Sequence, residues 1–156
     1  MQRREDDEAL VIRTDFGDEA AWRAVVEEVR RPWGDEGEFP PYVVVLERPE
    51  WEGARADEVF ARAAEDEELS VVFLADRHTM ESPVRALLAL NLGWEDPAGL
   101  DPVYDQELIE APEPRELRLV PGAVHVVHAN LQVANMDFAE FAEAAEEEPD
   151  GVLRGL

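Results

Sequence analysis

Two aspartates each follow a short apolar run in this sequence, and they are its first candidates for chemistry. Asp15 comes after the run at 9–13, and Asp76 comes after the run at 71–75. Such runs predict buried strands, and ligands of open α/β sheets collect beyond the carboxyl ends of strands. Two carboxylates there could hold Mg²⁺ or serve a metal-dependent enzyme or a phosphate-handling domain. The simpler alternative is local, with Asp15 capping the next helix and Asp76 starting a turn.

His125 and His128 form a second candidate site, within a Val-rich segment that follows Pro121. If this segment is helical, both imidazoles share a face and could ligate a transition metal with a carboxylate as third ligand. No other motif supplies ligands at a fixed spacing, and the sequence has no Cys. We therefore interpret both histidines as exposed or boundary residues and expect no cofactor.

Nucleophilic catalysis has few candidates in this sequence. The only serines are Ser70 and Ser82, and no Cys is present. Gly34 and Gly37 lack the Lys and Ser or Thr that complete a phosphate-binding loop. The sequence therefore favours a non-catalytic protein over an enzyme.

Three tryptophans are candidates for contact with a partner. Trp33, Trp51 and Trp94 fall in segments rich in Pro and Gly, and an exposed Trp is a frequent anchor of protein interfaces. The alternative is that these side chains pack down over the core as lids of their loops.

The segment 135–138, Asn-Met-Asp-Phe, is the best-defined local feature. Asn135 and Asp137 could belong to an edge that binds a partner. The alternative is a helix start, in which Asp137 is the N-cap and Met136 contacts Phe141 as a hydrophobic staple.

Charge is the strongest bulk property of the chain. It has 38 Asp and Glu against 14 basic residues, all Arg, for a net charge of −24 over 156 residues. Such a surface repels nucleic acid and anionic membranes and favours basic partners or cations. Acidic runs at 4–8, 65–68 and 146–150 are typical of solvated faces and tails. Salt adaptation would explain the same composition without any partner, and it predicts a melting temperature that climbs with KCl.

These residues must be positioned by a fold in which short apolar strands alternate with amphipathic helices. The length and the 46 % hydrophobic content predict one domain with a substantial core. We expect strands at 9–13, 42–47, 71–75 and 117–120, and helices near 18–31, 56–66, 121–134 and 137–146. Residues 84–92 fit a strand or a helix, and we favour the strand. Residues 1–8 are expected to be a flexible acidic terminus, and 93–114 a long loop or insertion.

Three segments of the chain resemble a known family. They are Ile-Arg-Thr-Asp-Phe at 12–16 with Ala21-Trp22, Phe-Leu-Ala-Asp at 73–76 with Thr79-Met80, and Ala-Asn-Met-Asp-Phe at 134–138 with Phe141-Ala142 and 151–155. Together they are similar to a family of small acidic proteins of unknown function, mainly from actinobacteria. The resemblance implies a bacterial single-domain protein and carries no catalytic residue with it.

The sequence therefore predicts a single α/β domain with a mostly parallel or mixed central sheet and helices on both faces. Its function is expected to be non-catalytic binding of a basic protein partner, of the immunity, inhibitor or adaptor type. Nucleic acid and membranes are not expected as partners. The absence of Cys and of a long apolar segment favours a cytoplasmic location.

Overall fold

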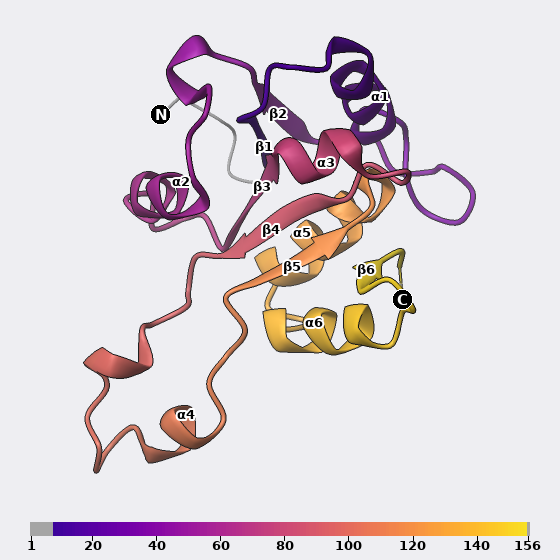
Figure 1. The fold of residues 1–156 in the computed structure, drawn as a ribbon. Coiled ribbons are helices and arrows are strands. Elements are labelled where there is room, and N and C mark those ends of the chain that lie inside the picture. Colours follow the sequence, from indigo (N-terminus) through magenta and orange to yellow (C-terminus); the bar gives the residue numbers. More distant parts are fainter. Residues whose placement is uncertain (1–7, 156) are drawn as a thin grey trace.

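The fold is built around one mixed sheet with six strands in the order β2-β1-β3-β4-β5-β6 (Figure 1). A computed structural model describes residues 8–155 of the chain, so most of the predicted flexible terminus at 1–8 lies outside the described residues. The strands are β1 (Ala9–Arg13), β2 (Val43–Leu46), β3 (Val71–Ala75), β4 (Leu87–Asn91), β5 (Glu116–Leu119) and β6 (Val152–Leu153). The prediction of a single α/β domain with a mixed sheet is confirmed.

The first half of the chain forms two crossover units that cover opposite faces of the sheet. The helices are α1 (Glu19–Val29), α2 (Ala56–Ala63), α3 (Arg77–Glu81), α4 (Gln106–Glu110), α5 (Val124–Gln132) and α6 (Phe138–Glu146). Strand β1 pairs in parallel with β2 on one side and with β3 on the other. The chain crosses from β1 to β2 on one side of β1 and then to β3 on the other side. The carboxyl ends of β1 and β3 therefore form a topological switch point.

The second half of the chain completes the sheet with antiparallel strands. Strand β4 pairs antiparallel with both β3 and β5, and β6 adds a short parallel pair at the far edge. The strand favoured for 84–92 is therefore present, although Leu and Ala are good helix formers, because partners on both sides bury it. Residues 152–153 form this edge strand.

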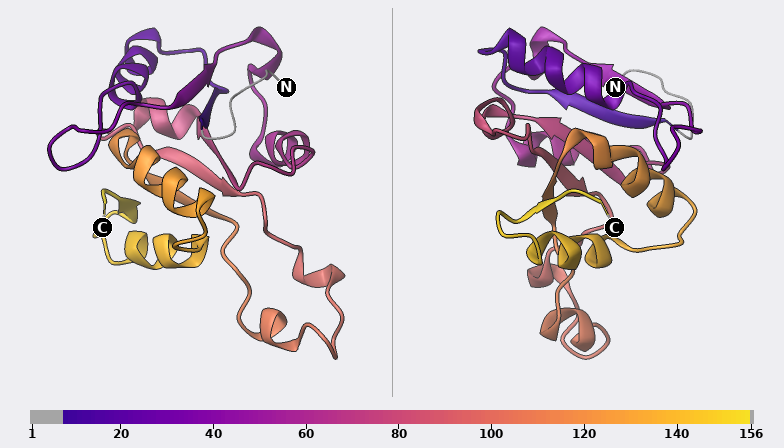
Figure 2. Two further views of the ribbon diagram at one scale, coloured as in Figure 1. Left: turned by 180° about the vertical axis from the view of Figure 1, so that it is seen from behind. Right: turned by 90° about the vertical axis from the view of Figure 1, so that its right-hand side faces the viewer.

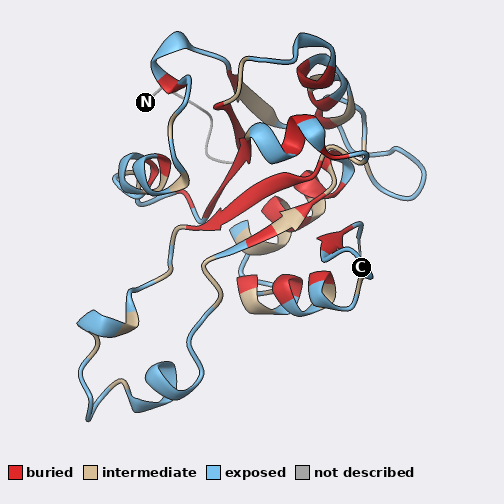
Figure 3. Ribbon diagram, in the orientation of Figure 1, coloured by how far each residue is buried: buried red, intermediate tan, exposed pale blue. Residues whose placement is uncertain are grey.

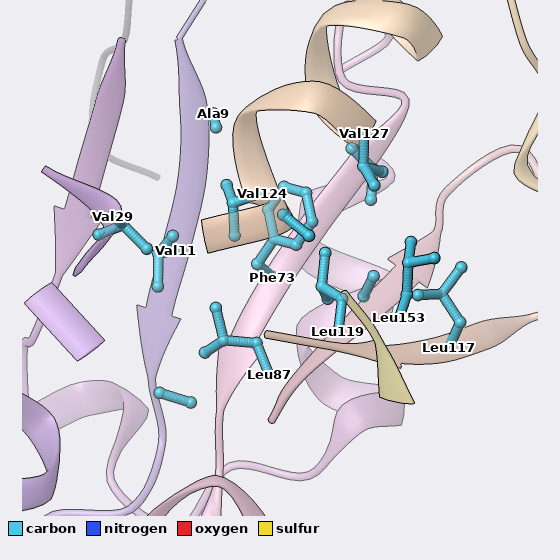
Figure 4. Packing of buried hydrophobic residues seen from close by; sticks show 14 of the residues in the cluster. Ala9, Val11, Val29, Phe73, Leu87, Leu117, Leu119, Val124, Val127 and Leu153 are labelled. Carbon is cyan, nitrogen blue, oxygen red and sulfur yellow. The ribbon is translucent and has the colours of Figure 1, made fainter. Parts of the chain in front are cut away.

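Two apolar clusters hold the layers together, one on each face of the sheet. The larger joins α1, α5 and α6 to one face and includes Trp22, Phe73 and Phe141 (Figure 4). The smaller lies under α2 and includes Trp51 and Val59. Strands with both faces covered need apolar side chains at every position, which explains the continuous runs in the sequence.

Helix boundaries follow the capping residues. Asp18 caps α1 by accepting a hydrogen bond from the Ala21 N–H, and Asp137 caps α6 in the same way from Glu140. Helix α5 is shorter than predicted, because Ala134 has left the helix with a φ of 54° and is exposed. Three short 3₁₀ turns occur at Pro49–Trp51, Pro97–Gly99 and Pro121–Ala123.

Residues 93–114, which connect β4 to β5, extend away from the body of the domain as an arm (Figures 1 and 2). The arm carries α4 and is mostly exposed, whereas the sheet is mostly buried (Figure 3). The predicted long loop is thus a projecting structure with a helical turn of its own.

Candidate functional site

The strand-end aspartates lie together at the switch point of the sheet. The N–H groups of Thr14 and Asp15 both donate to the Ala75 carbonyl, at 2.9 and 3.3 Å. Asp15 therefore begins the segment beside the end of β3, and Asp76 is the next residue of that strand. The sequence prediction that both acids reach one edge follows from the parallel pairing of β1 and β3.

Asp76 is already bound on both of its carboxylate oxygens. The Arg118 guanidinium donates to Oδ1 and Oδ2 at 2.8 Å each, and the Thr79 N–H donates to Oδ1 at 3.1 Å. Burial acts to raise the Asp76 pKa, but Arg118 and Thr79 outweigh it and hold that pKa below its ordinary value. The carboxylate thus caps α3 and links it to β5, much as the local alternative proposed.

Asp15 also has a local role, since its Oδ1 accepts the Gly17 N–H at 2.9 Å. Asp18, and not Asp15, is the cap of α1. Across residues 8–155, no three His, Cys, Asp or Glu side chains gather in a way that could hold a metal ion. The metal and phosphate hypothesis for Asp15 and Asp76 stays a prediction.

A buried arginine, which sequence reasoning missed, lies at the same edge of the sheet, at the end of β1 beside β3. Arg13 ends β1 with only 3 % of its side chain exposed, and it donates to Glu19 at 3.0 Å. Glu47, after β2, lies 3.7 Å from the Arg13 guanidinium and accepts a hydrogen bond from the Trp22 indole. The Phe16 ring lies 4.5 Å from the guanidinium carbon. The charges of Arg13, Glu19 and Glu47 are thus paired at the carboxyl edge of the sheet. One nitrogen, Arg13 Nη2, has no hydrogen bond within the described part of the chain.

The two histidines are buried, so their interpretation as exposed or boundary residues is wrong. His125 Nε2 lies 2.6 Å from the Val29 carbonyl at the end of α1, and its ring stacks on Trp33 with centroids 5.8 Å apart. Burial lowers the His125 pKa, and the Val29 carbonyl opposes that shift. His128 is buried one turn later on α5. The His125 side chain thus connects the start of α5 to the end of α1.

The three tryptophans do not form one surface. Trp51 is buried with 2 % exposure, so its assignment as a surface anchor is corrected, and the Arg62 guanidinium covers its ring at 4.5 Å. Trp33 is half-buried against Phe39, and its indole N–H donates to the Pro40 carbonyl at 3.2 Å. Trp94 is half-buried at the base of the arm. The loop-lid alternative describes Trp51 and Trp33 well, because Trp51 packs into the cluster under α2, and Trp33 packs against Phe39 and His125.

A large cavity lies at the other end of the sheet, beside the amino end of β3. Its volume is about 670 Å³. It is formed by four separate segments, the turn before β3, the end of β4, the base of the arm, and the α5–α6 connection. Its acidic lining residues are Asp66, Glu67, Glu113, Asp137 and Glu140. We call this cavity the acidic cleft.

Local structure explains why the α5–α6 connection faces the cleft. Asn135 donates from its backbone to the Asn130 carbonyl at 3.0 Å and from its side chain to Asn130 Oδ1 at 2.8 Å. The positive φ of Ala134 turns the chain at this point, and Asp137 then caps α6. Asn135 and Asp137, the two residues predicted at a partner-binding edge, therefore both line the acidic cleft.

The sequence of the chain matches a known protein family. The model of the domain of unknown function DUF6924 matches residues 8–156, nearly the whole length. The chain belongs to this family. No curated protein and no solved structure matches it. The resemblance to an uncharacterised family is thereby confirmed, and membership of DUF6924 assigns no activity to any residue.

For this DUF6924 domain, the acidic cleft suits the binding of a cation. Its lining contains no arginine, and Leu131 and Met136 provide half-buried apolar surface beside the acids. Lys and Arg side chains combine an apolar stem with a charged head, so they match such a lining. The arrangement can bind and orient a cationic group.

Sequence reasoning missed four of the five cleft acids in this DUF6924 domain, among them Glu140, which lies in the helix expected at 137–146. Asp66 and Glu67 belong to a run that was interpreted as a solvated face, and Glu113 lies in the expected loop. Their convergence depends on tertiary structure, because they come from different elements. The sequence contains only a weak signal for these acids, which is that the acidic run at 65–68 directly precedes a predicted buried strand. No helix of residues 8–155 is long and apolar enough to cross a membrane.

Proposed function

We propose that this protein is a non-catalytic binding module whose acidic cleft receives a cationic segment of a basic protein partner. The observation that carries the proposal is the lining of the cleft, which has five carboxylates and no basic side chain. Elsewhere in the molecule, acids are frequently paired with arginines, as at Asp76 and Arg118.

Four of the cleft acids keep their charge available to a ligand. Among the residues that the structure describes, four of them form no ion pair, namely Glu67, Glu113, Asp137 and Glu140. A unit charge 4 Å away interacts with each by about 1 kcal/mol even in water, and more strongly in a recess. Several such contacts together are sufficient to select a cationic segment over a neutral one.

The net charge of −24 supports the same partner class at long range. A field of this size steers basic proteins toward the surface and accelerates their association. It also repels nucleic acid and anionic membranes. A binding module of the immunity, inhibitor or adaptor type, acting on a basic partner in the cytoplasm, fits this distribution of charge.

A titration with a defined probe tests the proposal. Fluorescently labelled octa-arginine is titrated with the protein, and the dissociation constant is measured by anisotropy at about 50 mM and about 300 mM salt. The cleft variant Asp137→Asn/Glu140→Gln removes two charges and keeps a good N-cap, because Asn caps helices as well as Asp. We expect this variant to bind roughly tenfold more weakly at low salt, which corresponds to about 1.4 kcal/mol.

The matched control is Glu146→Gln/Glu147→Gln, which removes two exposed charges from the opposite end of α6 and its cap. Its net charge equals that of the cleft variant, so it should change the dissociation constant by less than about twofold. Equal weakening by both variants would show that the probe responds only to overall charge, and would overturn the assignment of the cleft.

A further inference from the structure

The arm, residues 93–114, ends in a tip that exposes large apolar side chains. Val103 is 77 % exposed and Tyr104 is 88 % exposed, the highest values among the large hydrophobic residues described. Both residues belong to the segment between the turn at Pro97–Gly99 and α4, and this segment lies at the far end of the arm (Figures 1 and 2). Adjacent exposed side chains of this size on a projecting element mark a candidate interaction surface.

The tip is held in one conformation by its own hydrogen bonds. Asp101 Oδ1 accepts the N–H groups of Val103 and Tyr104, at 2.8 and 3.1 Å. Asp105 Oδ2 in turn accepts the Asp101 N–H at 2.8 Å, and the Asp105 N–H donates to the Asp101 carbonyl at 2.9 Å. Val103 and Tyr104 are thus presented by a closed turn, which lowers the entropic cost of docking them.

The base of the arm is clamped to the body. Trp94 meets Phe60 of α2 edge to face, with centroids 6.2 Å apart, and the Arg115 guanidinium lies 5.1 Å from the Trp94 ring. Arg115 also forms an ion pair with Asp57, and Asn91 donates to the Pro114 carbonyl at 3.0 Å. The direction in which the arm leaves the sheet is therefore fixed at its base.

Charge selects the kind of partner that can cover the tip. The arm has no basic residue and seven acidic ones, which are Glu95, Asp96, Asp101, Asp105, Glu107, Glu110 and Glu113. A hollow of about 410 Å³ at the tip brings Val103, Tyr104 and Leu108 next to Asp105 and Glu107. A second copy of this chain would bring like charges together, so the complementary surface is apolar and bordered by basic residues.

We propose that the arm tip is a second docking element, which inserts Tyr104 and Val103 into an apolar depression bordered by basic residues on the protein partner. The inference rests on the proposed function, since it takes the same basic partner. Gly93 and Glu113 of the arm line the acidic cleft, so one partner surface can meet cleft and arm together.

Two peptides of equal charge test the tip separately from the cleft. Both carry octa-arginine and a flexible Gly/Ser linker, and they end either in Leu-Trp-Leu or in Ser-Asn-Ser. The wild-type protein should bind the apolar peptide roughly tenfold more tightly than the polar one, because an anchoring aromatic contact is worth at least that factor. Tyr104→Ser and Val103→Ser should each bring the ratio of the two dissociation constants closer to one.

Tyr42→Ser is the matched control, since Tyr42 is half-exposed on the body of the domain, and it should keep the wild-type ratio. The cleft variant Asp137→Asn/Glu140→Gln should weaken both peptides equally and also keep the ratio. The inference is overturned if the wild-type protein binds both peptides with similar dissociation constants, or if Tyr104→Ser leaves the ratio of these constants unchanged. This holds even if octa-arginine still binds the cleft. Conversely, a Tyr104-dependent ratio without any effect of the cleft variant overturns the proposed function and retains the tip.

A photo-crosslinker locates the contact directly. Benzoylphenylalanine at position 104 should crosslink to the Leu-Trp-Leu end of the apolar peptide, as mapped by mass spectrometry. The same residue at position 42 should give no crosslink above background. Crosslinks of equal yield from both positions would show non-specific association and contradict docking at the tip.

Discussion

Carboxylates gather at both ends of the sheet, and those at the carboxyl end are paired with arginines, whereas the recess of the acidic cleft is lined by none. At the carboxyl end, Arg118 binds Asp76, and Arg13 contacts Glu19 and Glu47. At the opposite end, the acidic cleft has no arginine in its lining. The chain has 14 arginines for 38 acids, so many acids have no arginine to pair with. Under the proposed function, acids of the cleft attract a cationic partner.

The largest effect predicted from this comparison comes from removing an arginine at the carboxyl end. Arg118→Met leaves the Asp76 carboxylate unpaired among α3, β4 and β5. We expect a loss of about 2–3 kcal/mol in the free energy of unfolding, somewhat below the usual loss for a fully buried pair. The two side chains are 24 % and 26 % exposed, so water recovers part of the penalty. Urea unfolding followed by circular dichroism measures the change.

Asp76→Asn in the Arg118→Met background should recover part of that loss, because the orphaned charge is then gone. If Arg118→Met changed stability no more than an exposed substitution does, within about 0.5 kcal/mol, the pair would not hold the fold and the contrast between the two ends would fail.

The sequence predicts the strands better than the sites, and particular residues show why. Buried strands need apolar residues at every position, so 9–13 and 71–75 are visible as runs. The Asp137 cap is visible too, because capping is local. Strand β6 has only two residues and exists through its pairing with β5, and Ala134 leaves α5 although its residue type favours a helix.

Both ends of the sheet also depend on contacts that are distant in sequence. Asp76 and Arg118 are 42 positions apart, and no local pattern connects them. The cleft takes Glu67, Glu113 and Asp137 from three segments, of which only Asp137 stood out as a candidate. Burial of His125 depends on the end of α1, 96 positions away. Sequence patterns show which face of a helix or strand is apolar, but tertiary packing determines which of these faces come into contact.

The dependence of stability on pH provides a smaller and more specific test of the carboxyl end. Because the Asp76 pKa is lowered in the folded state, this group contributes stability above the pKa of the unfolded chain. That contribution is lost as the pH falls through the folded pKa. The stability difference between wild type and Asp76→Asn should therefore be constant above pH of about 5 and shrink below about 4.

Taking a difference between two variants removes the background from the other acids, which also titrate in this range. Urea unfolding between about pH 3 and pH 7 gives the values. In the Arg118→Met background this pH dependence should reverse its sign, because burial, which raises the Asp76 pKa, is then opposed only by Thr79. A pH dependence that keeps its wild-type sign in that background would assign the effect to another group.

A still smaller effect is expected in the acidic cleft, and with the opposite sign. Glu67→Gln/Glu113→Gln removes two exposed charges that form no ion pair within residues 8–155. Relief of repulsion should stabilise the fold by about 0.3 kcal/mol at low salt, and screening should abolish the gain near 1 M KCl, where the Debye length is about 3 Å. Thermal unfolding at both salt concentrations measures it. Destabilisation at low salt would mean that these acids have partners that support the fold.

The smallest expected effect concerns Mg²⁺ at the switch point. Both Asp76 oxygens accept hydrogen bonds from Arg118, so a cation would have to displace a guanidinium before it could bind there. A ligand that binds only the folded state raises its stability by RT ln(1 + [L]/Kd). We therefore expect about 5 mM MgCl₂ to shift the melting temperature by less than about 1 °C relative to KCl of equal ionic strength. A rise of several degrees that disappears in Asp15→Asn and Asp76→Asn would reverse the comparison. It would make the carboxyl end the functional site and restore the metal-dependent hypothesis for these two aspartates.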